Sequence, residues 1–259
     1  MKKRVERGVL PVENRKFSEH RGAAVPFKEG EMTGIETARR FFAGTAPTYD
    51  LSVRLWTLGL DQWWKRKILR KIPPVPERLL DQACGTGILT LQMARRFSTC
   101  RVVGIDIHRE YLTLASRKAV SLGLGNVQWV QGRAEDVILK DRYDCIVSSY
   151  LAKYANIKLL IQGAEKMLRQ GGVLVIHDFT YPRGPFFSEA LGIYFRIMRT
   201  FGSRILPQWK IVFSELEGFL KQSQWVSELI SSLERNGFAM ILAEKLSFGF
   251  ATVVSAVKK

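Results

Sequence analysis

The sequence predicts an α/β fold with a mostly parallel sheet, helices on both faces and a C-terminal antiparallel hairpin. From about residue 75, short apolar runs alternate with segments of helical periodicity, which is the pattern of βαβ units. A glycine turn, Gly85-Thr86-Gly87, separates the first apolar run from the first helical segment. Two further apolar runs at 238–242 and 251–257 predict the closing hairpin.

The expected elements follow in order along the chain. Strands are predicted at 78–81, 102–105, 127–130, 145–147 and 173–176, and helices at 88–97, at 110–122 and in a segment ending near residue 168. In the first helix, Leu89, Met93 and Phe97 recur every four residues and would form one apolar face. Gly171-Gly172 is expected to end the third helix, because glycine readily adopts left-handed backbone.

The length of 259 residues fits one large domain over residues 33–259. Residues 33–74 contain two predicted helical segments, 75–180 form the core with the glycine turn, 181–235 are a helical insertion, and 236–259 are the closing strands. Residues 1–32 lack periodicity and are expected to be a flexible basic extension.

Composition excludes several classes of protein. Forty Lys and Arg against 24 Asp and Glu give a net charge of +16, which favours anionic partners. No apolar stretch approaches the roughly 18 residues of a membrane-spanning helix. The three cysteines form no CxxC pair, so neither a disulfide framework nor a metal site is expected. A cytoplasmic location fits this composition best.

The glycine turn predicts a nucleoside cofactor. A dinucleotide usually requires a third glycine three residues after Gly87, where this chain has Thr90, and no Lys-Ser or Lys-Thr follows as in a P-loop. Asp106 ends the second predicted strand, 21 residues after Gly85, where a carboxylate can accept hydrogen bonds from both ribose hydroxyls.

These residues resemble class I S-adenosylmethionine-dependent methyltransferases, and more narrowly the ubiquinone/menaquinone-biosynthesis C-methyltransferases. The narrower resemblance rests on residues 42–50 (FAGTAPTYD) and 58–66 (LGLDQWWKR), and the wider one includes residues 80–90 (LDQACGTGILT). It implies a Rossmann-like, seven-stranded sheet, with S-adenosylmethionine as cofactor and S-adenosylhomocysteine as product. The 75–180 core would bind this cofactor, and 181–235 would cover the substrate.

The resemblance also implies which residues contact the cofactor. They are Tyr49, Asp81, Ala83, Gly85, Thr86, Gly87, Asp106, Ile107, Arg133, Ala134 and Ser149. Arg133 departs from the family pattern, because arginine has no hydrogen-bond acceptor for the adenine amino group. Asp136 is the nearest carboxylate that could accept a hydrogen bond from the adenine amino group instead. Alternatively, Asp136 is a solvated turn residue. Tyr49-Asp50 would close over the cofactor as a lid, or Asp50 would cap a helix.

Candidates for catalysis lie at the predicted strand ends, where open α/β sheets bind ligands. A ring carbon becomes nucleophilic when its phenol ionises, which calls for a base or a cation that stabilises the phenolate. Lys153 follows the fourth strand, and His177 and Asp178 follow the fifth. The family usually has Arg-Asn where this chain has Lys153-Tyr154. A strand-end histidine is more often a packing residue than a catalyst.

The expected partner is a hydrophobic small molecule, with an anionic membrane surface as a second one. Trp56, Trp63 and Trp64 stand among cations, and a second apolar stripe runs from Phe186 to Met198. Alternatively, these side chains pack in the core. The competing functions are a methyltransferase for another lipid, sterol or natural product, an RNA or protein methyltransferase, and a non-catalytic subunit. Nucleic acid is not favoured, and the sequence leaves open whether the chain forms a homodimer.

Overall fold

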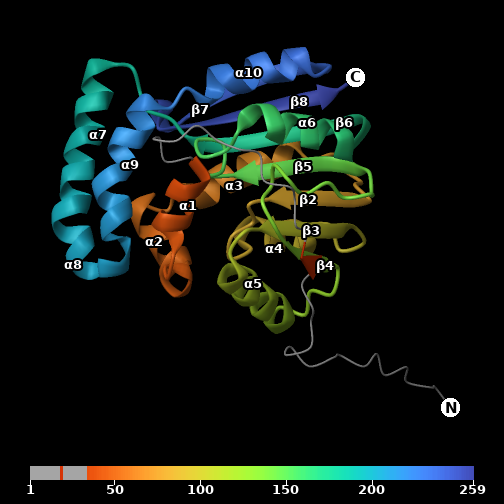
Figure 1. The fold of residues 1–259 in the computed structure, drawn as a ribbon, viewed down its shortest axis with the longest axis horizontal. Helices are drawn as coiled ribbons and strands as arrows, with labels where there is room; N and C mark the ends of the chain where they lie inside the picture. Colours follow the sequence, from red (N-terminus) through yellow and green to blue (C-terminus); the bar gives the residue numbers. More distant parts are fainter. Residues whose placement is uncertain (1–17, 20–33) are drawn as a thin grey trace.

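The computed structural model describes residues 18–19 and 34–259, which form one mixed sheet surrounded by helices (Figure 1). The strand order is β1-β4-β3-β2-β5-β6-β8-β7. All neighbouring pairs from β1 to β6 are parallel, whereas β8 is antiparallel to both β6 and β7. The strands are β1 (Ser18–Glu19), β2 (Arg78–Gln82), β3 (Arg101–Asp106), β4 (Val127–Gln131), β5 (Tyr143–Ser149), β6 (Leu168–Phe179), β7 (Phe238–Leu246) and β8 (Ala251–Lys258).

The predicted fold class is confirmed, with seven strands between residues 78 and 258 and the hairpin at the end. The two-residue β1 is an addition at the edge of the sheet, within the stretch predicted as a flexible extension. The remaining residues of that stretch lie outside the described part of the chain.

Helices flank the sheet and continue beyond it. They are α1 (Gly34–Phe42), α2 (Tyr49–Trp56), α3 (Leu60–Lys71), α4 (Ile88–Arg96), α5 (Arg109–Ser121), α6 (Ile157–Met167), α7 (Pro185–Ile197), α8 (Ser203–Ile205), α9 (Lys210–Gln222) and α10 (Trp225–Arg235). A π-helical turn, η3 (Met198–Gly202), joins α7 to α8. Short 3-10 turns are η2 (Ala46–Thr48), η4 (Pro207–Trp209) and η5 (Ser247–Gly249).

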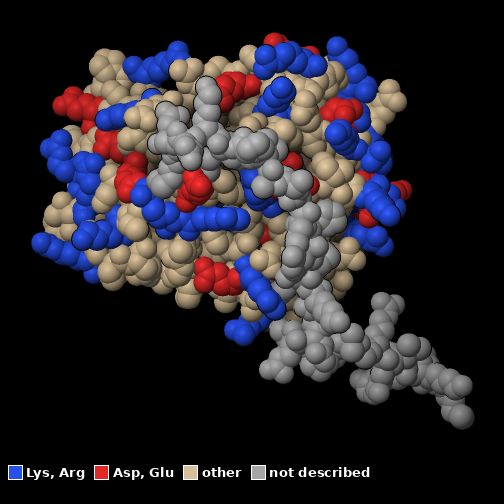
Figure 2. Space-filling model, viewed as in Figure 1, with Lys and Arg blue, Asp and Glu red and all other residues tan. Residues whose placement is uncertain are grey.

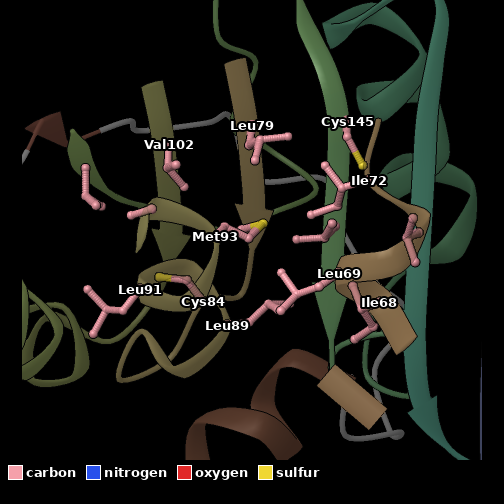
Figure 3. Packing of buried hydrophobic residues seen from close by; sticks show 14 of the residues in the cluster. Ile68, Leu69, Ile72, Leu79, Cys84, Leu89, Leu91, Met93, Val102 and Cys145 are labelled. Atoms are coloured by element: carbon pink, nitrogen blue, oxygen red, sulfur yellow. The ribbon is translucent and has the colours of Figure 1, made fainter. Parts of the chain in front are cut away.

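Two apolar layers cover the two faces of the sheet. On one face, α3, α4 and α5 pack against β2, β3 and β5, with Ile68, Met93 and Leu79 fully buried between them (Figure 3). On the other face, α6 and α10 bury Leu160, Leu229 and their neighbours. Burial on both faces explains why these strands are continuous apolar runs rather than alternating ones.

A third apolar cluster lies outside the sheet layers and is built from α1, α7, η3 and α9. Figure 1 shows α7 and α9 side by side, with α1 and α2 between them and the sheet. This helical cap encloses space next to the carboxyl ends of β5 and β6, as the cavities described below show. Most of its helices come from residues 181–235, the segment predicted as a helical insertion.

Two local predictions were wrong. The stretch before the sheet contains three helices, not two, because Gly59 in left-handed backbone (φ 77) separates α2 from α3. The third core helix ends at Met167, before Gly171. Gly171 does have left-handed backbone (φ 71), but it lies inside β6, where the pairing with β5 shifts register between Tyr143 and Cys145. It therefore allows an irregularity in a strand.

Candidate active site

Two cavities meet at the carboxyl ends of the central strands. One, which we call the polar cavity, encloses about 690 Å³ including space open to solvent. Its wall is formed by Ile35, Ala38, Phe42, Tyr49, Ala83, Gly85, Asp106, Ile107, His108, Tyr111, Gly132, Ala134, Glu135, Ser149, Tyr150, Leu151 and Tyr154. Seven of the residues predicted to hold the cofactor therefore lie on one wall: Tyr49, Ala83, Gly85, Asp106, Ile107, Ala134 and Ser149.

The turn after β2 has the backbone shape that its glycines predict. Gly85 and Gly87 have positive φ, at 57° and 82°. A Cβ on Gly85 would point toward the rings of Tyr111 and Tyr49, at 3.7 and 3.9 Å, and so would occupy cavity space. A Cβ on Gly87 would lie 3.0 Å from the Ala115 Cβ, so this glycine allows α4 and α5 to approach. The turn therefore keeps backbone open toward a ligand.

Asp106 is fixed in the polar cavity by two backbone donors. The Gly85 N–H donates to its Oδ2 at 2.8 Å, and the His108 N–H donates to its Oδ1 at 2.9 Å. The residue is only 7% exposed. Each carboxylate oxygen can still accept a second hydrogen bond, so the side chain is oriented for a pair of hydroxyl donors.

Glu135, rather than Asp136, provides the second carboxylate of the polar cavity. Arg133 lies 3.6 Å from Glu135 and 3.5 Å from Asp136, measured between guanidinium nitrogen and carboxylate oxygen. Only Glu135 lines the cavity, whereas Asp136 is a partly exposed partner of Arg133. An acceptor for an amino group is therefore available, one residue before the position predicted from sequence.

Asp81, Thr86, Gly87 and Arg133 do not reach the wall of the polar cavity. Asp81 is buried behind the turn and accepts a hydrogen bond from the Thr90 hydroxyl at 2.6 Å. Burial raises the pKa of Asp81 to about 7, against the opposing effect of that hydrogen bond. Asp81, Thr86 and Gly87 therefore belong to the turn and its support, whereas Arg133 contacts Glu135 and Asp136 after β4.

The turn is tied to the helical cap through Asp50. Its carboxylate accepts hydrogen bonds from the Thr86 hydroxyl and from Lys118. Asp50 is the second residue of α2, whose N-cap is Thr48, so the alternative role as an N-cap was wrong. Tyr49, its neighbour, lines both cavities and lies 5.3 Å from the Tyr111 ring between centroids.

The second cavity is almost entirely aromatic and aliphatic, and we call it the aromatic cavity. It encloses about 1250 Å³ including open space, between the helical cap and the ends of β5 and β6. Much of the predicted stripe from Phe186 to Met198 faces it, through Leu191, Tyr194, Phe195 and Met198. It shares Phe42, Tyr49, Tyr150 and Tyr154 with the polar cavity, so these four aromatic side chains form the boundary between the two.

Lys153 brings a buried cation to the wall of the aromatic cavity. Its Nζ lies 2.6 Å from Asp178 Oδ1 and 4.4 Å from the centroid of the Tyr154 ring. Burial lowers the pKa of Lys153, while the Asp178 carboxylate acts in the opposite direction. Two of the three predicted catalytic residues, Lys153 and Asp178, thus form one ion pair, of which the lysine faces the cavity.

His177 is placed as a packing residue. It is fully buried, lines neither cavity, and lies against the rings of Trp64 and Tyr150. Its Nδ1 is 3.0 Å from the Ser149 hydroxyl, and its Nε2 has no hydrogen-bond partner among the described residues. Burial lowers the pKa of His177 well below its ordinary value, so the ring is neutral.

Solved structures share this fold and identify its fold class. The chain superimposes on a S-adenosylmethionine-dependent methyltransferase from Aquifex aeolicus with a TM-score of 0.53 and 18% identity, covering 75% of this chain and 89% of that one. It superimposes on geranyl diphosphate C-methyltransferase from Streptomyces coelicolor with a TM-score of 0.57 and 14% identity, covering 77% of each chain. The fold is that of class I S-adenosylmethionine-dependent methyltransferases.

The sequence comparisons then identify the family. The profile of the ubiE/COQ5 methyltransferase family matches residues 32–258, so the chain belongs to that family and is a S-adenosylmethionine-dependent methyltransferase. The ubiquinone/menaquinone biosynthesis C-methyltransferase of Geotalea daltonii is 29% identical, covering 86% of this chain and 97% of the relative. The mitochondrial 2-methoxy-6-polyprenyl-1,4-benzoquinol methylase of Rattus norvegicus is 25% identical, covering 84% and 78%.

The polar cavity fits this cofactor. Gly85 leaves room where a side chain would enter, Asp106 presents oriented acceptors, and Glu135 adds an acceptor at the Ala134 side. Sequence reasoning missed Glu135 and Tyr150. Glu135 directly follows Ala134, a predicted cofactor contact, so its position in the sequence could have identified it. Nothing local in the sequence marked Tyr150, which lies on the boundary of both cavities and forms a hydrogen bond with Asp61, 89 residues away.

Proposed function

We propose that this methyltransferase transfers the methyl group to a ring carbon of a prenylated quinol or a similar hydrophobic phenol. The observation that carries the proposal is the shared boundary of the two cavities. A flat ring in the aromatic cavity would lie against Tyr49, Tyr150 and Tyr154, which also line the polar cavity. The names of the relatives, which are methylases of quinone precursors, support the same class of acceptor.

The size and lining of the aromatic cavity suit an acceptor with an apolar chain. Its wall includes Trp56, Phe195 and Phe213, and the space continues to Leu58, which is 79% exposed. A prenyl chain would bury apolar surface there, at roughly 25 cal/mol for each Å² removed from water. The chain end would reach the protein surface at Leu58.

The bound cofactor supplies an activated methyl group, so the protein must orient the acceptor, exclude water and favour the phenolate. Tyr49 and Phe42 would separate the reacting atoms from solvent, since they lie on the boundary of both cavities. Lys153 is the one Lys or Arg side chain among the described residues that line the aromatic cavity. A cation there stabilises negative charge that develops on the acceptor oxygen.

The proposal also includes contact with an anionic membrane surface, where a prenylated quinol would be found. Leu55, Leu58, Ile197, Phe201 and Ile205 are between 44% and 79% exposed, and we call them the apolar rim. The Tyr194 hydroxyl donates to the Trp56 carbonyl and thereby joins α7, which carries Ile197, to α2, which carries Leu55. Arg54, Arg199 and Arg204 lie on the same segments and are exposed. No helix of residues 34–259 has the length and apolar character to span a bilayer.

The neighbouring tryptophans of α3 differ in exposure. Trp64 is buried against the sheet and donates a hydrogen bond to the Ser247 hydroxyl at 3.0 Å, whereas Trp63 is 40% exposed. Lys and Arg are distributed over the face seen in Figure 2, with Asp and Glu among them, rather than gathered in one patch. That distribution favours a small acceptor over a polyanion such as RNA.

The decisive experiment supplies the purified protein with S-adenosylmethionine carrying a labelled methyl group. The acceptors are reduced demethylmenaquinone, a 2-polyprenyl-benzoquinol, and a sterol or phospholipid mixture. Mass spectrometry should find the label on a ring carbon of a quinol. Label only in the sterol or phospholipid fraction would replace the proposal with a lipid methyltransferase, which the departure of Lys153-Tyr154 from the family's Arg-Asn favours as the second candidate.

A further inference from the structure

Tyr150 connects the boundary of the two cavities to a carboxylate that neither cavity exposes. It directly follows β5 and lines both cavities. Its hydroxyl donates a hydrogen bond of 2.6 Å to Asp61 Oδ1, on α3. Asp61 is 3% exposed and lies on the wall of neither cavity. A phenol on the boundary of the two cavities is thus linked to a buried carboxylate.

Two contacts hold Asp61 in place, one to its side chain and one to its backbone. Lys65 forms a buried ion pair with Asp61, and the Asp61 N–H donates to the Thr57 hydroxyl oxygen at 3.2 Å. Lys65 is 3% exposed, and its Nζ lies 4.8 Å from the centroid of the Tyr150 ring. Removing such an ion pair from water is costly, so its presence next to a cavity calls for an explanation.

The backbone of Tyr150 is also unusual. It has a φ of 69°, a left-handed conformation that large side chains rarely adopt. Its ring stacks on Phe179 at 4.7 Å between centroids, and its N–H donates to the His177 carbonyl at 2.9 Å. Strained residues that the surrounding structure holds in place are concentrated at functional sites. With this backbone conformation, the Tyr150 side chain extends from the end of β5 to Asp61 on α3.

We propose that Tyr150 and Asp61 form a proton relay that ionises the hydroxyl of the methyl acceptor. This inference rests on the proposed function only in that the acceptor is a phenol or quinol. Tyr150 is the catalytic residue, because its hydroxyl contacts the acceptor oxygen. Asp61 acts through Tyr150, and Lys65 balances the charge of Asp61 before the transfer.

The acceptor O–H proton moves to Tyr150 Oη as the Tyr150 proton moves to Asp61. The resulting phenolate directs electrons into the ring, whose carbon forms a bond to the methyl group. The sulfur–methyl bond breaks and its electron pair stays on sulfur. The methylated ring, now a dienone, loses its ring C–H proton to solvent, and its oxygen recovers a proton from Asp61 through Tyr150. One proton is released in total.

The electrostatic surroundings explain why a relay is required. Burial, together with the Asp61 carboxylate, raises the pKa of Tyr150 well above its ordinary value. Tyr150 therefore keeps its proton at neutral pH and cannot act as a base alone. It can accept a proton only while passing its own to Asp61, which lies at hydrogen-bond distance.

The first test removes the hydroxyl of Tyr150 in the full-length enzyme. Tyr150→Phe should lower kcat about 100-fold or more, the lower end of typical acid-base contributions, with the KM for the acceptor and the affinity for S-adenosylhomocysteine unchanged. Tyr143→Phe is the matched control, because Tyr143 is a buried tyrosine at the opposite end of the same strand. Wild-type kcat in Tyr150→Phe would overturn the proposal.

The second test asks whether the two residues act as a unit. Asp61→Asn keeps the shape and an oxygen acceptor but cannot take up the proton, and thermal melting checks that Lys65 without its partner still permits folding. The double variant should be no slower than the slower single variant, because both substitutions interrupt one relay. Rate losses that multiply in the double variant would contradict a shared path.

A third measurement separates this inference from the choice of acceptor. 4-Nitrophenol reports its own ionisation by absorbance and needs no methyl transfer. Below its solution pKa, a larger fraction of the probe should be ionised when bound to the wild-type protein than when bound to Tyr150→Phe. If quinols are not methylated but this difference is found, the relay stands and the quinol is the wrong acceptor. Equal ionised fractions, or no binding to the wild-type protein, would refute the relay.

Discussion

The ammonium group of Lys153 and the carboxylate of Asp178 form a buried ion pair, with 2.6 Å between Nζ and Oδ1. Asp178 also accepts a hydrogen bond from the Lys153 N–H at 3.0 Å, so one carboxylate fixes both the backbone and the side chain of the lysine. The pair orients a cation at the wall of the aromatic cavity. Lys153 would therefore present a fixed positive charge to the acceptor. Its role in catalysis can be tested by changing that charge.

Substitutions of Lys153 should distinguish a cation from a base. Lys153→Arg should retain much of the turnover if the residue stabilises a phenolate, because arginine stays charged, whereas a deprotonated base would be lost. Lys153→Met should lower turnover about 100-fold or more in either case. The Lys153→Met/Asp178→Asn double variant controls for an unpaired buried carboxylate. Wild-type turnover in Lys153→Met, measured with saturating acceptor, would exclude the residue from catalysis.

The protein should bind S-adenosylmethionine and S-adenosylhomocysteine and should not bind NAD. The turn contains Gly85 and Gly87 but Thr90 at the position of the third glycine, so it lacks the close helix approach that a pyrophosphate requires. Titration calorimetry with each ligand measures this directly. Tight binding of NAD with no heat from either sulfur nucleoside would contradict the assigned class of cofactor.

Asp106→Ala should weaken S-adenosylhomocysteine binding by about 1.5 kcal/mol or more, the scale of a hydrogen bond to a charged group. The substitution also removes the acceptor for the Gly85 and His108 N–H groups, so the turn loses an anchor. Asp106→Asn keeps one acceptor and should bind with intermediate affinity. Calorimetry gives the affinities and thermal melting gives the stability. A lower melting temperature with unchanged affinity would make Asp106 purely structural.

The sheet could be predicted from sequence because its strands are buried on both faces. Runs such as 102–105 are apolar throughout, and glycine or polar turn residues lie close to their ends in the sequence. The local sequence pattern gave a wrong prediction where strand pairing determined the secondary structure. Gly171 has the expected left-handed backbone, but pairing with β5 placed it in a strand rather than at the end of a helix.

The site could be predicted only in part, for the same reason. Gly85 and Asp106 lie at the start and end of one turn-helix-strand unit, so their sequence spacing predicts that they come together. Tyr150 and Asp61 are 89 residues apart, and their hydrogen bond depends on how α3 packs against the sheet. No spacing rule connects them. The importance of Glu135 over Asp136 likewise depends on the direction of one turn after β4.

The buried carboxyl group of Asp81 predicts a pH dependence of stability. Its pKa is raised to about 7 in the folded chain, against an ordinary value near 4 in the unfolded chain. Between these values the folded chain binds more protons, so the free energy of unfolding should fall as the pH rises from about 4 to about 7. At about 1.4 kcal/mol for each pKa unit, the contribution is up to about 4 kcal/mol.

Denaturant unfolding of the wild-type protein and of Asp81→Asn tests this dependence. The variant cannot ionise at this position, so its unfolding free energy should fall less over the same pH range. Asp141→Asn, at an exposed loop position, corrects for the general loss of one negative charge. Parallel pH profiles for the wild-type protein and Asp81→Asn would show that the carboxyl group titrates equally in both states.

The apolar rim predicts binding to anionic vesicles. Leu58 is 79% exposed and also lines the aromatic cavity, so insertion of the rim would place the mouth of that cavity in the lipid. Exposed arginines on the same segments should add electrostatic attraction that weakens as salt screens it. Sedimentation with vesicles of phosphatidylserine and phosphatidylcholine should therefore remove the protein from solution at low salt. Equal binding to vesicles of phosphatidylcholine alone would refute the electrostatic part.

A matched pair of substitutions tests whether the rim itself makes the contact. Leu58→Ser should reduce vesicle binding, because it removes the apolar side chain at the mouth of the cavity. Met240→Ser is the control, since Met240 is also 79% exposed and has a similar φ of 50°, against 52° for Leu58, but lies on β7. The two variants therefore differ mainly in where the lost apolar surface lies. Equal losses of vesicle binding would mean that overall apolar exposure, and not the rim, brings the protein to the membrane.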